Sequence, residues 1–186
     1  LADQGGPDAF GYTFIDSDEP GGPSFQWLDL AGVGNEISLG DDDRQQVSIG
    51  FSFLFYGQAY TQATIHSNGA LSLTNNALTY TSTCLPYSGP PSALIAVHWD
   101  DMNPANGGSI LHDTAGTSPN RVFTAQWRNV PHYSNSGNYD FEVSLFEAAG
   151  EILLQYEDVT SSPSYDHGSP ATVGSQARHS FYLQHR

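Results

Sequence analysis

Apolar and polar residues alternate along much of the chain with a period of two, which is the period of an extended strand. The alternation is clearest in residues 51–73, which predict three strands with three phenylalanines on one face. Within this stretch, Asn68-Gly69 predicts a two-residue hairpin, because both central residues of a type I′ turn need positive φ. Such a meander is not stable alone in water, so the rest of the chain is expected to cover it with a second layer.

Further strand-like segments lie on both sides of this meander. The apolar run 94–99 is expected to be a central strand covered on both faces. The run 139–146 alternates cleanly, with the aromatic and aliphatic residues at 139, 141, 143 and 145 facing in. Shorter strands are expected at residues 10–15, 25–30, 109–112, 121–127, 152–156, 171–173 and 180–184. Because no long window has a helical period, about ten to twelve short strands predict an all-β, antiparallel β-sandwich of jelly-roll-like type.

The length of 186 residues fits one domain, with residues 1–9 as a flexible, Gly-rich lead-in and residues 10–186 as a single sandwich. No boundary or internal repeat is visible inside it. We find no apolar run long enough to span a bilayer and no signal peptide. The single cysteine, Cys84, excludes an internal disulfide, and we expect it to be a buried small apolar residue; a bridge between molecules is the alternative.

The net charge of −15, with five arginines and no lysine, changes the expected partners. It repels phosphate backbones and anionic lipids, so nucleic acid and membrane insertion are not expected. It suits cations, Ca²⁺ above all, and a salty external medium that screens self-repulsion. A merely solubilising acidic surface is the alternative interpretation of the same charge.

Three segments together resemble the nidogen-like (NIDO) pattern: "FSFLFYGQAYTQATIHSNGALSL", then "LIAVHWDDMNP", then "GGSI". The flanking segments "GYTFIDSDEPGGPSFQWLDL", "FTAQWRNVPHY" and "FEVSLFEAAGEILLQYEDV" are similar to a module of bacterial secreted and cell-surface proteins. The resemblance runs from Gly11 to about Val173. It implies a secreted or cell-surface, non-catalytic β module and implies no particular ligand. The chain departs from the pattern at His98, where an aromatic residue is more usual.

Two loops offer the hard oxygen ligands that Ca²⁺ prefers. Their candidate residues are Asp16, Asp18 and Glu19 in a Gly/Pro-rich loop, and Asp100, Asp101 and Asn103 after the apolar run. Neither has the spacing of an EF-hand, and capping of Asx turns is the alternative role for these side chains. We expect residues 41–43, three consecutive aspartates, to be a plain acidic turn.

Two other loops combine aromatic rings with amides and hydroxyls, a composition that can stack on a sugar and bond its hydroxyl groups. The candidate ligand-binding residues are His132, Tyr133, Asn135 and Asn138 in one loop, and Tyr165 and His167 in the other. Ordinary loop composition is the alternative explanation. Catalysis is not expected, because the chain has no Gly-x-Ser-x-Gly elbow, no paired-histidine metal motif and no lysine.

The sequence therefore leaves three functional hypotheses. The first is a non-catalytic extracellular binding or adhesion module, Ca²⁺-stabilised, that recognises a glycan or protein at a surface. The second is a structural subunit of a self-assembling extracellular filament, in which residues 1–9 add a strand to a neighbouring copy. The third, a hydrolase, requires activity that depends on a single Asp or Glu.

Overall fold

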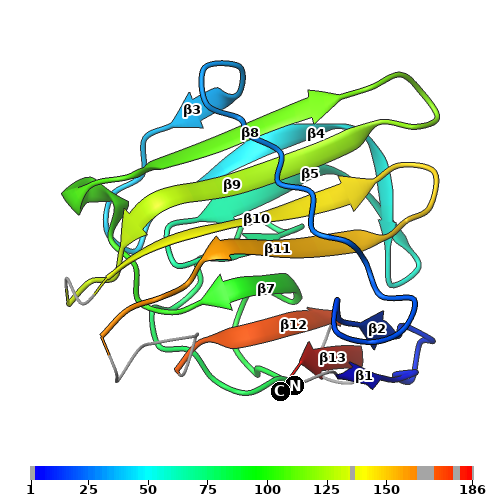
Figure 1. Ribbon diagram of the computed structural model, residues 1–186. Helices are drawn as coiled ribbons and strands as arrows, with labels where there is room; N and C mark the ends of the chain where they lie inside the picture. The colour runs from blue at the N-terminus through cyan, green and yellow to red at the C-terminus, as the bar shows by residue number, and fades with distance from the viewer. Residues whose placement is uncertain (1–2, 135–136, 163–169, 178–180, 186) are drawn as a thin grey trace.

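The computed structural model describes residues 3–134, 137–162, 170–177 and 181–185, and it is an antiparallel β-sandwich (Figure 1). A six-stranded sheet, in the order β13-β12-β7-β6-β5-β4, forms one layer. Its strands are β4 (Arg44–Phe55), β5 (Gln58–His66), β6 (Ala70–Ser72), β7 (Ala93–Trp99), β12 (Thr172–Ala177) and β13 (Phe181–His185). The predicted all-β sandwich is confirmed.

A five-stranded sheet, in the order β11-β10-β9-β8-β3, forms the facing layer. Its strands are β3 (Asn35–Ile37), β8 (Ser109–Ala115), β9 (Val122–Pro131), β10 (Asn138–Phe146) and β11 (Ile152–Asp158). Two short strands, β1 (Gln4–Gly5) and β2 (Phe14–Ile15), form a small separate sheet, and one 3₁₀ turn, η1, spans Pro104–Asn106.

The core between the layers is rich in aromatic rings. Phe53 and Phe55 of β4 are buried on one side, and Trp127 of β9 stacks on Phe141 of β10 on the other, with centroids 5.0 Å apart. The inward positions predicted on residues 139–146 all belong to the main core, as expected, although the intervening Glu142 and Ser144 are also buried. Each such ring contributes roughly 1.5–3 kcal/mol by leaving water, so the core is the main source of stability.

Strand β7 is buried along its whole length, as the apolar run predicted. Its second face is covered by the irregular segment between β6 and β7, where Leu78, Leu85 and Tyr87 pack with Trp99. The Trp99 indole N–H donates to the carbonyl of Thr79 at 2.9 Å. The segment thus forms a small second core outside the sheet.

Residues 25–30, predicted as a strand, run over the five-stranded sheet without joining any sheet (Figure 1), and side chains of that sheet bond their backbone. They cross the outer face of the five-stranded sheet, where Gln126, Glu142 and Gln155 lie side by side on β9, β10 and β11. The Gln155 amide accepts from Gln26 N and donates to Gln26 O, at 2.7 and 2.9 Å. An amide side chain can pair like a peptide group, so this strap (residues 25–30) is held without a strand partner.

The two tight turns of the meander differ from the prediction. Tyr56-Gly57 joins β4 to β5 as a two-residue loop with both residues at positive φ, +47° and +76°. Between β5 and β6 the loop has three residues, 67–69, and only Gly69 has positive φ, +69°. The type I′ turn therefore lies at Tyr56-Gly57, and the Asn68-Gly69 loop has the longer form that ends in a left-handed glycine.

Three smaller expectations also need revision. The strand predicted at 10–15 is restricted to Phe14–Ile15, and Asn35–Ile37, which is not among the expected strands, is the edge strand β3. Cys84 is exposed, so the prediction of a buried residue is wrong. In residues 1–9, Gln4–Gly5 pairs with Phe14–Ile15 of the same chain.

Candidate functional site

Three carboxylates that are distant in sequence meet at one end of the six-stranded sheet. Asp41 and Asp42 lie in the turn before β4, and Asp101 lies in the loop after β7. One carboxylate oxygen from each lies within 4.8 Å of the others. Among the residues that the structure describes, this acidic cluster is the one group of three or more such side chains close enough to hold a metal ion.

The buried side chain of Asn68, in the β5–β6 loop, ties the two acidic loops together. Its Nδ2 donates to Oδ1 of Asp42 at 2.8 Å, and its Oδ1 accepts from the backbone N–H of Met102 at 3.0 Å. The same loop pairs with Asp43, whose carbonyl accepts from Ser67 N at 2.9 Å. Asn68 therefore fixes one carboxylate of the cluster directly and positions the loop that carries another.

Desolvation and the neighbouring carboxylates raise the pKa values of two members of the cluster, Asp41 and Asp101. The pKa of Asp41 is raised by partial burial first and by the neighbouring Asp42 second. The pKa of Asp101 is raised mainly by burial and then by Asp42, Asp41 and Asp100, while His132 lowers it. A bound cation removes this repulsion, and three carboxylates supply up to six of the oxygens that Ca²⁺ coordinates. The donor set therefore fits a hard divalent cation.

The loop that carries the predicted ligand-binding residues His132 and Tyr133 adjoins the acidic cluster. His132 forms an isolated bridge with Met102, and Tyr133 N donates to the carbonyl of Asp101 at 2.8 Å. Tyr133 is 52% exposed. Two sets of residues that the sequence offered separately, for a cation and for a ligand, are thus neighbours in the fold.

A buried polar chain runs beneath this surface. His132 Nε2 lies 3.6 Å from Oδ2 of Asp100, and both side chains are nearly inaccessible to solvent. Asp100 Oδ1 accepts from Asp101 N at 2.9 Å, whereas its Oδ2 has no hydrogen-bond donor in the described part of the chain. His98 packs its ring on Tyr139 at 4.9 Å, so it occupies an aromatic position, and burial lowers its pKa to about 4.

The other predicted residues lie elsewhere or serve local roles. The Asp16 carboxylate accepts from the backbone N–H groups of Asp3, Asp18 and Glu19, at 2.6, 3.0 and 3.2 Å, which is the Asx-turn alternative. Asn103 caps η1 by accepting from Ala105 N at 3.0 Å. Asn138 is exposed and donates to Asn129 Oδ1 at 2.9 Å. The remaining predicted residues, Asn135, Tyr165 and His167, lie outside the described residues.

Sequence reasoning missed Asp41, Asp42 and Asn68. Residues 41–43 were expected to be a plain acidic turn, and Asn68 was assigned only a turn role. The available signal was the run of three aspartates directly before a strand that must pair with the Asn68-containing hairpin. Asp43 does behave as expected, because its carboxylate accepts from Gly40 N and Arg44 N at 3.2 and 2.8 Å.

Comparison with known proteins places the chain in one family. The family model described as "NIDO related" matches residues 17–185, nearly the whole chain. No curated protein matches the sequence, and no solved structure matches it either. In the described ranges, no helix has the length and apolar character needed to cross a membrane. The chain belongs to the NIDO-related family.

Proposed function

We propose that this chain is a non-catalytic extracellular module that binds Ca²⁺ at its acidic cluster and uses that end to contact a glycan or protein on a surface. Membership of the NIDO-related family suggests an extracellular module. The observation that carries the finer proposal is the convergence of Asp41, Asp42 and Asp101, together with the backbone bond that joins Asp101 to the exposed residue Tyr133.

Calcium has two effects in this proposal. It neutralises the carboxylates, and so it holds the loop before β4 against the loop after β7. It also keeps coordination positions for oxygens from outside the protein, because the three carboxylates do not by themselves fill a site of six to eight ligands unless all bind through both oxygens. A sugar hydroxyl or a carboxylate of a partner protein can occupy such a coordination position, while the Tyr133 ring packs on an apolar surface of the same ligand.

The non-catalytic part of the proposal must account for Ser134, which contacts His132. The Ser134 hydroxyl lies 2.7 Å from His132 Nδ1, and Asp100 lies on the other side of the ring. The same Nδ1 also accepts the backbone N–H of Ser134 at 3.0 Å, and the Asp100 contact, at 3.6 Å, is longer than a hydrogen bond. We interpret this arrangement as a local turn, and a fluorophosphonate probe is expected to leave Ser134 unlabelled. Labelling that is lost in Ser134→Ala would contradict the proposal.

The filament hypothesis gains no support from residues 3–9. Gln4–Gly5 pairs with Phe14–Ile15 of its own chain, and Asp3 N donates to the Asp16 carboxylate at 2.6 Å. Because residues 3–5 are bonded to their own chain in this way, donation of this segment as a strand to a neighbouring copy is not part of the proposal.

Thermal unfolding with Ca²⁺ and with EDTA tests the cation site. At a Ca²⁺ concentration 100 times its Kd, binding stabilises the folded state by about 2.7 kcal/mol, which raises the Tm by about 5–10 °C for a domain of this size. Asp42→Asn is expected to abolish most of this shift. Asp18→Asn, which removes the same charge from an exposed position in the other acidic loop, is the matched control and is expected to retain it.

Ligand binding is tested on glycan arrays and on immobilised surface proteins, with and without chelator. Tyr133→Ala is expected to weaken binding without changing the Tm, because the ring is half exposed. An unchanged Tm in EDTA together with no binding to any arrayed glycan or protein would reject the proposal.

A further inference from the structure

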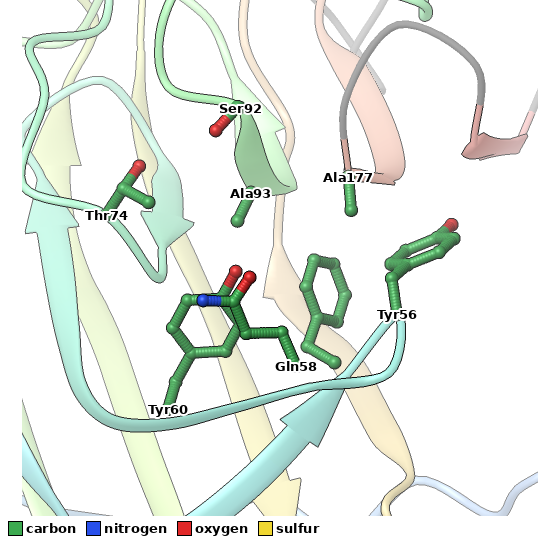
Figure 2. Close-up of a pocket in the computed structure, with 8 residues that line it drawn as sticks. Tyr56, Gln58, Tyr60, Thr74, Ser92, Ala93 and Ala177 are labelled. Carbon is green, nitrogen blue, oxygen red and sulfur yellow. The ribbon is translucent and has the colours of Figure 1, made fainter.

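A pocket of about 320 Å³ opens at the end of the six-stranded sheet opposite the acidic cluster. Figure 2 shows Gln58 and Tyr60 on one side of this space and Thr74, Ser92 and Ala93 on the other. Tyr56, from the β4–β5 turn, closes a third side. Strand β4, with twelve residues, separates the two ends of the sheet by roughly 40 Å.

The pocket exists because the sheet is incomplete at this end. Strand β6 has three residues and pairs only with residues 64–66 of β5, so residues 58–63 extend past it. The chain leaves the sheet after Leu73, whose N–H donates to the carbonyl of Ala93 at 2.9 Å. Because the facing positions Ala93 and Ala177 carry small side chains, the space beside the free part of β5 is not filled from within.

Apart from Ala93 and Ala177, the described residues that line the pocket are aromatic or hydrogen-bonding, and none of the described lining residues is charged. The Tyr56 ring is fixed in place, since it stacks on Tyr12 at 4.4 Å and its hydroxyl donates to Asp8 at 2.8 Å. Gln58 and Ser92 are exposed and present an amide and a hydroxyl. The Thr74 hydroxyl oxygen is buried and has no hydrogen-bond partner in the described ranges, so it can bond a group that enters the pocket.

We propose that this pocket binds a single neutral sugar unit. The Thr74 hydroxyl without a hydrogen-bond partner, the Gln58 amide and the Ser92 hydroxyl can bond the several hydroxyl groups of a sugar. The tyrosine rings can pack on its apolar C–H face. Among the residues that the structure describes, the lining holds no charged group to pair with an ionised ligand, and the net charge of −15 disfavours acidic sugars in particular. A volume near the lower end of the usual range of about 300–1,000 Å³ suits one ring better than a long oligosaccharide.

This site is independent of the proposed Ca²⁺ site, because it lies at the opposite end of the sheet and its described lining residues include no carboxylate. Sugar binding in the pocket is therefore expected to persist in EDTA and in Asp42→Asn. These two conditions separate the pocket from recognition at the acidic cluster, so either proposal can fail without the other.

The test is a titration of the full chain with glucose, galactose, mannose and N-acetylglucosamine, followed by NMR shifts of backbone amides and by calorimetry. Glucuronic acid is the charged comparison. At least one neutral sugar is expected to shift the amide signals of residues 58–60 and 74, whereas glucuronic acid is not. Gln58→Ala and the isosteric Thr74→Val each remove one hydrogen bond, so each is expected to weaken binding about two- to tenfold.

Ser134→Ala, at the opposite end of the sandwich, is the control that should bind normally. Three results would overturn the proposal. The first is no amide shift at residues 58–60 and 74 with any neutral sugar, and the second is wild-type affinity in both Gln58→Ala and Thr74→Val. The third is loss of sugar binding in EDTA. Because Gln58 is exposed, its variant is expected to fold normally, and an unchanged circular dichroism spectrum verifies correct folding of both variants.

Discussion

Glu142→Ala should loosen the strap over the five-stranded sheet. The carboxylate of Glu142 is fully buried beneath the strap. Its Oε1 accepts from Leu28 N at 3.1 Å and from the Gln155 amide at 2.7 Å, and its Oε2 accepts from the Gln126 amide at 2.7 Å. Alanine leaves these three donors without their acceptor.

The magnitude follows from the number of orphaned donors. Each buried donor that loses its acceptor costs about 1–3 kcal/mol, and water that enters the vacated space recovers part of that cost. Removal of the buried charge also relieves its desolvation. We therefore expect a net loss of about 3 kcal/mol, which lowers the Tm by about 6–12 °C. Ser144→Ala is the control on the same strand, because it removes a single neutral bond, to Thr124 at 2.9 Å, and costs about 1 kcal/mol.

The assay combines thermal unfolding with amide hydrogen exchange. Faster exchange at Leu28 in Glu142→Ala, with unchanged exchange in β9, would show that the strap opens locally. If Glu142→Ala destabilises the chain no more than Ser144→Ala does, then the strap is not held by this carboxylate.

The pH dependence of Glu142 gives a second check. Burial raises the pKa of Glu142 above 4.5, although its amide and backbone donors act in the opposite direction. The folded state therefore holds the proton more tightly than the unfolded state, so this stabilisation is complete below pH 4.5 and is lost as the pH rises through the folded-state pKa. The Tm of the wild type minus that of Glu142→Gln is expected to fall as the pH rises from 4.5. A difference that grows with pH would refute the reasoning.

Two further predictions concern a turn and an ion pair. Gly69→Ala places a Cβ 2.2 Å from the carbonyl oxygen of His98 at φ +69°, whereas Gly32→Ala, at φ +76°, meets nothing within 4 Å. By denaturant titration, Gly32→Ala should lower the free energy of unfolding by only the roughly 1–2 kcal/mol of left-handed backbone strain, and Gly69→Ala should lower it by clearly more. Equal losses of stability in the two variants would contradict the predicted clash. Hydrogen bonds from Arg121 lower the pKa of Glu147 to about 2, so its stabilisation is present above pH 4.5 and is lost as the pH falls towards 2. The Tm difference between wild type and Glu147→Gln should shrink over that interval, and a constant difference would argue against the pair.

Local sequence patterns are enough to predict the class of fold and much of its interior. Alternation with a period of two is a local property of an extended chain, so it identified the inward residues of β10 and the doubly covered β7 from neighbouring letters alone. The family resemblance was also present in the sequence, because its motifs lie on individual strands and turns. The turns were predicted less well. The type I′ turn lies at Tyr56-Gly57, where Tyr56 has positive φ and its ring stacks on Tyr12, a contact that the local sequence does not reveal.

The tertiary structure alone decided what the loops and the outer faces do. Asp41 and Asp42 meet Asp101 because the start of β4 and the end of β7 fall at the same end of one sheet, and sheet order is a non-local property that no short segment encodes. Glu142 faces away from the main core, as alternation predicted, yet it is buried because a strap from distant sequence crosses above it. Periodicity reports which face a side chain takes; whether that face meets water depends on which other part of the chain covers it.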